Sequence, residues 1–177
     1  IQDGKIRYTG TLSEAEKLAP QAKRLNLNNK TVIPGIIDAH SHLNSVGMQQ
    51  TVANLYPPPD GKVVSIATLI QEMKAWAKQN PTFVQATAGW IIGNGYDDAQ
   101  LQEKAHPTAT DLDQISTTQP VLILHQSGHL ASVNHKALEL LGINEKSSNP
   151  SGGVIRRVVG TNIPNGVLEE SVVIEAM

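Results

Sequence analysis

Short apolar stretches alternate with amphipathic helical patterns from Ile36 onward, and this alternation limits the folds open to the chain. Residues 66–79 carry apolar side chains at the spacing of a helix that is buried on one face, and Ser65 is placed to cap its start. Residues 121–124 (VLIL) form a continuous apolar run of the length expected for a buried parallel strand. Strands and helices in this order predict βα units on a parallel sheet.

Further elements follow from turn and capping residues. We expect additional strands over residues 24–27, 31–33 and 83–92. We expect three additional helices. One covers residues 133–141 and is capped by Ser132, a short one follows a cap at Thr110, and one begins at Gly166. Gly142 stands where a glycine commonly ends a helix, and residues 164–166 (PNG) read as a turn. The chain therefore reads as a small β domain, residues 1–34, that leads into an α/β domain, residues 35–177.

Composition excludes several classes of protein. Fourteen Lys and Arg residues stand against sixteen Asp and Glu residues, and the net charge of −2 favours neither nucleic acid nor an anionic membrane as a partner. The sequence contains no apolar run of about 18 residues that could span a bilayer. The absence of cysteine excludes disulfides, cysteine-based metal sites and a thiol nucleophile.

Both ends of the sequence favour a piece of a longer protein. There is no initiator Met, and Asp3-Gly4 is a hairpin turn signal that needs a strand on each side. The helix expected from Gly166 has no stop signal before the last residue. A processed chain with frayed ends is the alternative, and the compartment, cytoplasmic or periplasmic, stays open.

The sharpest chemical feature is His40-Ser41-His42, which follows the apolar pair Ile36-Ile37. Side chains two residues apart on a strand point to the same face, so both imidazoles can bind one metal ion at the strand's carboxyl end. Asp38 lies two residues before His40, so its side chain points to the same face, and it is expected to orient the imidazoles. Two histidines at this spacing also occur by chance, in which case their role is structural.

Residues 32–43 (VIPGIIDAHSHL) resemble the first-strand signature of the metal-dependent amidohydrolase superfamily. Three further blocks, residues 89–97, 120–143 and 150–170, resemble its amidohydrolase-3, or YtcJ-like, branch. The resemblance implies an α/β fold: the first part of a (β/α)8 TIM-like barrel, preceded by part of a small β-sandwich. A complete barrel of this kind takes about 250 residues, so the barrel implied here is truncated.

The resemblance also implies roles for individual residues. His40 and His42 match two metal ligands. Glu170, with Glu169 as the alternative register, matches a catalytic carboxylate at the metal centre. His129 matches a Gly-His motif that lines the substrate pocket.

Other polar and aromatic residues carry weaker expectations. Trp90 and Tyr96 are expected to shape the substrate pocket, with core packing as the alternative. His125 and His135 stand where the branch has other residues, and neither is expected to bind metal. Gly93-x-Gly95 lacks the third glycine of a dinucleotide-binding loop, so it does not favour a nucleotide site.

The implied activity is that of a metal-dependent hydrolase acting on carbon–nitrogen bonds other than peptide bonds. One or two divalent ions, Zn²⁺ first among them, would activate water for attack on an amide-like carbon of a small-molecule substrate. This chain alone is expected to be inactive, because the family's later ligands and its catalytic Asp would follow Met177. The alternative is a non-catalytic α/β ligand-binding module or a degraded relative without metal. Assembly into a homo-oligomer is left open.

Overall fold

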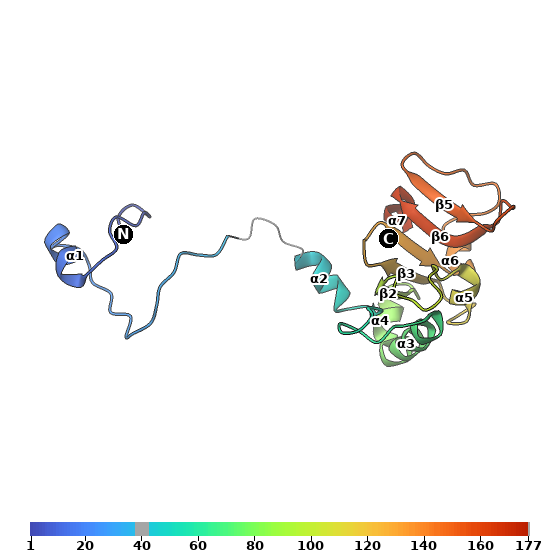
Figure 1. Cartoon of the computed structure of the whole chain (residues 1–177), viewed down its shortest axis with the longest axis horizontal. Helices are drawn as coiled ribbons and strands as arrows, with labels where there is room; N and C mark the ends of the chain where they lie inside the picture. Colours follow the sequence, from blue (N-terminus) through green and yellow to red (C-terminus); the bar gives the residue numbers. More distant parts are fainter. Residues whose placement is uncertain (38–42, 177) are drawn as a thin grey trace. The chain divides into compact units, whose positions relative to one another are not determined.

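The computed structural model describes residues 1–37 and 43–176 and divides the chain into two compact units, Ile1–Ser41 and His42–Met177 (Figure 1). Within the described ranges, no helix is long and apolar enough to cross a membrane.

The first unit contains a tight turn, one short helix and extended chain. Asp3 and Gly4 both have positive φ, and paired backbone hydrogen bonds join Gln2 and Lys5 on either side of them. This is the turn that Asp-Gly predicts. The helix α1 (Leu12–Leu18) follows Thr11, whose side chain caps it, and none of its residues is buried.

The strands predicted over residues 24–27 and 31–33 are wrong, because neither segment forms a β-ladder in the described part of the chain. Their apolar side chains Leu25, Val32 and Ile33 are exposed. A strand needs a neighbour for its backbone groups and a surface for its apolar face. Residues 1–37 provide neither, and the assignment of residues 1–34 to a β-sandwich stays a prediction.

The second unit is built on a six-stranded sheet with the strand order β1-β2-β3-β4-β6-β5. Its strands are β1 (Ala53–Asn54), β2 (Ile91–Tyr96), β3 (Val121–His125), β4 (Leu130–Val133), β5 (Gly153–Arg157) and β6 (Pro164–Glu170). The first three strands are parallel, whereas β4, β6 and β5 pair antiparallel with their neighbours. The α/β class is confirmed. The predicted parallel pairing holds for β1, β2 and β3 and is wrong from β4 onward.

The change from parallel to antiparallel pairing follows from the length of one connection. β3 ends at His125 and β4 begins at Leu130, with a turn between them in which Gly128 has a φ of +75°. A parallel neighbour would need a crossover of about a dozen or more residues. Ser127-Gly128 is a turn signal that could have predicted this hairpin.

The second unit also contains six helices in the described part of the chain. They are α2 (Leu43–Gln49), α3 (Ile66–Gln79), α4 (Pro81–Ala86), α5 (Ala109–Asp113), α6 (His135–Leu140) and α7 (Ser171–Ala176). The prediction of α3 and its Ser65 cap is confirmed, and the cap is a reciprocal one with Thr68. Leu69 and Met73 of α3 are fully buried in one core cluster with Ile91 and Ile123 of the sheet.

Two helix caps differ from the prediction. Asn134, not Ser132, caps α6: its side chain accepts a hydrogen bond from the N–H of Ala137 at 2.9 Å. Ser132 instead lies inside β4, where pairing with β3 and β6 uses its backbone. Thr108, not Thr110, caps α5, and Gly142 ends α6 with a φ of +68°, as predicted.

The strand predicted over residues 83–92 is displaced to Ile91–Tyr96. Pro81 starts the helix α4 there, because its fixed φ and missing N–H suit the first helical position. Gly93 lies inside β2 rather than at its end. A Cβ on Gly93 would lie 2.5 Å from a methyl carbon of Leu55 and 2.6 Å from the sulfur of Met73, so glycine allows this close packing.

The turn predicted over residues 164–166 and the helix predicted from Gly166 are also wrong. Residues Pro164–Glu170 form β6, which pairs with β4 on one side and β5 on the other, and the helix α7 begins only at Ser171. Val167 and Leu168 are buried in this strand. Pairing on both sides outweighs the local turn signal.

Candidate functional site

The expected metal ligands His40 and His42, together with Asp38, lie outside the described residues. Their roles stay predictions. The described site residues Tyr96, His129 and Glu170 lie at the ends of β2 and β6 and at the start of β4, whereas Trp90 directly precedes the first residue of β2.

His129 and Glu170 lie together although they are 41 positions apart in the sequence. The N–H of Glu170 donates to the carbonyl of His129 at 2.8 Å, and His129 Nδ1 lies 3.0 Å from Glu170 Oε2. Both side chains are open to solvent, with exposed fractions of 65% and 57%. A carboxylate beside an imidazole at an accessible edge can take up and release a proton.

Glu169 has a different partner from Glu170. Neighbouring side chains on a strand point to opposite faces. Glu169 accepts a hydrogen bond from Arg156 of β5 and is less exposed than Glu170. Glu170 is therefore the carboxylate of this pair that meets His129.

The two aromatic residues lie in different core clusters. Trp90 lines a cavity of about 580 Å³ whose walls include Phe83, Leu122 and Leu124. Tyr96 is fully buried in the other cluster, where its hydroxyl lies 3.3 Å from Ser132 Oγ and 3.2 Å from His106 Nδ1. Burial raises the pKa of Tyr96 to about 12, so the phenol stays protonated at neutral pH.

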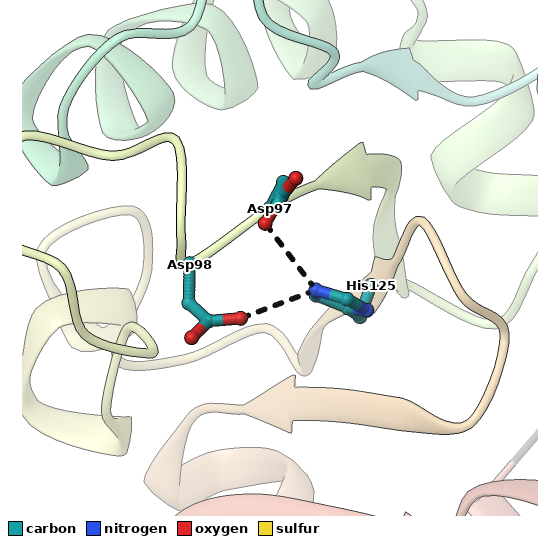
Figure 2. A group of neighbouring side chains, drawn as sticks. All are labelled: Asp97, Asp98 and His125. Carbon is teal, nitrogen blue, oxygen red and sulfur yellow. Dashed lines mark ion pairs between the residues drawn. The ribbon is translucent and has the colours of Figure 1, made fainter.

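A second polar group lies where β2 and β3 end. Figure 2 shows the carboxylates of Asp97 and Asp98 directed at the ring of His125. His125 Nε2 lies 3.2 Å from Asp98 Oδ1 and 3.8 Å from Asp97 Oδ1. The side chain of His125 is 11% exposed, and its Nε2 is buried without a hydrogen-bond partner among the described residues.

Hydrogen bonds hold Asp97 in place. Its Oδ2 accepts from the side-chain amides of Gln100 at 2.9 Å and Gln126 at 2.7 Å, and its Oδ1 accepts from the N–H of Ala99 at 2.9 Å. The hydrogen bond from Gln100 above all, together with that from the N–H of Ala99, holds the pKa of Asp97 below its ordinary value. The carboxylate is therefore charged at neutral pH.

His106 borders the same group. Its Nδ1 lies 3.7 Å from Asp98 Oδ1, and its ring stands edge-on to that of His125 with centroids 6.0 Å apart. Burial lowers the pKa of His106, so this ring is neutral at pH 7.

This group was not predicted from the sequence, in which His125 was expected not to bind metal. The error in placing β2 was the cause, because a strand ending at residue 92 leaves Asp97 in a distant loop. Once β2 and β3 are known to be parallel neighbours, acidic residues after one and a histidine ending the other are expected to meet.

In α/β proteins, ligands commonly bind at the carboxyl ends of parallel strands, and polar groups gather at that edge of the sheet here. Residues 23–177 match the Amidohydrolase family, and the chain belongs to this family. The resemblance seen in the sequence is thereby confirmed.

Two curated relatives illustrate the relationship. The N-substituted formamide deformylase of Arthrobacter pascens is 28% identical over 172 residues, which cover 97% of this chain and 30% of that protein. YtcJ of Bacillus subtilis (strain 168), named provisionally as an amidohydrolase, is 29% identical over 88% of this chain and 28% of that protein. The chain thus spans about 30% of the length of these relatives.

Solved structures agree with this assignment. An uncharacterized metal-dependent hydrolase from Pyrococcus horikoshii OT3 matches with a TM-score of 0.53 at 28% identity, over 99% of this chain and 30% of that one. A second such hydrolase, from Pyrococcus furiosus, matches with a TM-score of 0.51 at 24% identity and supports the fold alone.

Proposed function

We propose that this chain is part of a metal-dependent hydrolase that acts on carbon–nitrogen bonds other than peptide bonds. The observation that carries the proposal is the family match over residues 23–177, which includes both His40-Ser41-His42 and Glu170. One relative is named for its action on N-substituted formamides. Small N-substituted formamides are therefore the first substrate class to test.

The donor groups of the chain suit a divalent cation. His40 and His42 would hold it through imidazole nitrogens, which Zn²⁺ accepts as ligands, and the carboxylate of Glu170 would act beside it. Of the two carboxylate oxygens of Glu170, only Oε2 has a hydrogen-bond partner among the described residues. Oε1 is therefore open. When bound, such a cation acts as a Lewis acid, lowers the pKa of water from about 15.7 towards about 7, and polarises the substrate carbonyl.

Glu170 is the residue to which we assign proton transfer. Its carboxylate takes a proton from the attacking water and gives it to the leaving nitrogen. His129, 3.0 Å away, positions that carboxylate by a hydrogen bond. Trp90 supplies an apolar wall for the substrate, and Asp38 orients the imidazoles of His40 and His42.

We expect the chain by itself to show no hydrolase activity. It spans about 30% of the length of its relatives, and a complete barrel takes about 250 residues. Formate release from N-substituted formamides should therefore appear only in a polypeptide that includes the complete barrel.

The test uses that longer polypeptide and measures bound metal together with formate release. His40→Ala/His42→Ala should lose one equivalent of metal and the activity, whereas Glu170→Gln should keep the metal and lose about 10²–10⁴-fold in kcat. His135→Gln is the matched control, because His135 is also exposed and paired with a carboxylate, Asp113, but has no assigned role. Unchanged metal content in the double variant would contradict the ligand assignment and favour a non-catalytic binding module.

A further inference from the structure

We propose that Asp97, Asp98 and His125 form a second site for a divalent cation, at the carboxyl ends of β2 and β3. The site is independent of the proposed hydrolase centre, because none of its three residues has a role in that reaction. It places two carboxylates and one imidazole around a common point (Figure 2).

The spacing of the donor atoms fits a bound ion. One atom from each residue lies within 4.8 Å of the other two, and Nε2 of His125 is 3.2 and 3.8 Å from the two carboxylate oxygens. Ligand atoms bound tetrahedrally at about 2.0–2.2 Å are about 3.3–3.6 Å from one another. Small side-chain movements would therefore complete the coordination.

The Nε2 atom of His125 is the observation that points to a ligand. It is buried and has no hydrogen-bond partner among the described residues, although it faces two carboxylates. Buried polar groups without partners are rare because they cost free energy. A cation between Nε2 and the carboxylates would bond to this nitrogen and balance the two negative charges.

Neighbouring groups hold the donors in the required orientation. Gln100 and Gln126 bind Oδ2 of Asp97, which turns Oδ1 towards His125. On the far side of the imidazole, Nδ1 of His125 lies 2.8 Å from Ser127 Oγ. Histidine ligands commonly have their second nitrogen hydrogen-bonded in this way, and that bond sets the ring orientation.

The tautomer of His125 should report the bound ion. The backbone N–H of Ser127 points at Nδ1 from 3.1 Å, so the free ring carries its proton on Nε2. An ion bound to Nε2 displaces that proton. Nδ1 then carries one and donates it to Ser127 Oγ, 2.8 Å away, and the backbone N–H of Ser127 must turn away from the ring. One proton leaves the ring and one is taken up.

The donor set selects the class of ion. Imidazole together with carboxylates suits Zn²⁺ or Mn²⁺, whereas Mg²⁺ and Ca²⁺ prefer oxygen ligands alone. Asp98 is more exposed than its two partners, so it offers a route for the ion and room for water in the remaining positions.

In the binding experiment, Zn²⁺ is titrated into the 177-residue chain carrying His40→Ala/His42→Ala, and the heat of binding is measured by calorimetry. We expect one equivalent to bind, and either Asp98→Asn or His125→Gln should weaken that binding at least about tenfold. His135→Gln should leave it unchanged, since His135 meets a single carboxylate, Asp113, at 2.7 Å. Unaltered affinity in both cluster variants, or no binding in the background chain, would overturn the site.

A spectroscopic reading in the unaltered chain does not depend on variant folding. Long-range ¹H–¹⁵N spectra should show the His125 proton moving from Nε2 to Nδ1 as Zn²⁺ is added, with His135 unaffected. Zinc that binds while the His125 tautomer stays the same would refute the proposal. Because the reading is taken at His125 and not at His40 or His42, its outcome is separate from that of the hydrolase proposal.

Discussion

The parallel half of the sheet (β1, β2, β3) and the antiparallel half (β4, β6, β5) bury their apolar side chains in different ways. The parallel half packs against α3, with Leu69 and Met73 set between helix and sheet. The antiparallel half packs against α6 and α7, with Leu168 at its centre. β3 is shared, because Ile123 faces the first cluster and Leu122 faces the second.

This difference explains where polar chemistry collects. The last parallel strand ends at His125. A short turn then leads to His129, and the first antiparallel strand begins directly after His129. Glu170, at the end of β6, lies beside His129. The junction between the halves therefore carries both the hydrolase residues described by the structure and the proposed cation site.

The largest expected effect comes from removing one core leucine from each half. Leu69→Ala and Leu168→Ala should each lower the free energy of unfolding by about 2–5 kcal/mol, since both side chains are fully buried. Because β3 belongs to both clusters, we expect one cooperative transition in each variant. Urea denaturation followed by circular dichroism and tryptophan fluorescence would test this, since Trp76 packs on the first cluster and Trp90 on the second.

Two transitions in Leu168→Ala would show that the halves unfold separately. The exposed Leu140 provides a control, and Leu140→Ala should change the free energy of unfolding by no more than about 0.5 kcal/mol.

A smaller contrast is expected between the helix caps of the two halves. Asn134 is fully buried: its Oδ1 accepts from the N–H groups of Val121 and Ala137, and its Nδ2 donates to two carbonyls. Asn134→Ala leaves these groups unpaired and should cost about 2–3 kcal/mol. Ser65→Ala removes only a helix cap and should cost about 1 kcal/mol.

Thermal unfolding of both cap variants gives the comparison, and Asn134→Asp refines it. Aspartate keeps the acceptor but loses the two donated bonds and buries a carboxylate against two carbonyl oxygens, so its cost should be at least that of Asn134→Ala. Equal losses for Asn134→Ala and Ser65→Ala would mean that Asn134 does no more than cap α6.

The fold could be predicted where local pattern decides the structure. The stripe and cap of α3 and the apolar run of β3 are complete within the sequence window that forms them, and both predictions are confirmed. β4 and β6 could not be assigned in this way. Ser132 resembles a cap and Gly166 a turn residue, and only pairing with distant strands places them in the sheet.

The site follows the same division. His129 and Glu170 could be singled out from motifs, although the sequence did not show that they touch. The group of Asp97, Asp98 and His125 depends on which strands are neighbours and on where β2 ends. The end of β2 was predicted too early because Gly93 and Gly95 resemble turn residues that close a strand. Their close packing against Leu55 and Tyr56 is not visible in the sequence.

The smallest expected effect is a pH dependence at the junction of the two halves. Tyr96 of β2 lies near both Ser132 of β4 and His106. Burial lowers the pKa of His106, as do the charge of Arg156 and the neighbouring His125, while Asp98 and Glu169 oppose that change.

Because the folded pKa of His106 is below its ordinary value of 6.5, the unfolded chain takes up this proton first as the pH falls. The contribution of neutral His106 is therefore complete above that value and is lost progressively as the pH falls below it and through the lower folded pKa. Urea denaturation over this range should show a smaller loss of stability in His106→Gln than in the unaltered chain. The exposed His135→Gln should retain the full loss, and identical pH profiles for His106→Gln and the unaltered chain would show that protonation of His106 does not loosen the junction.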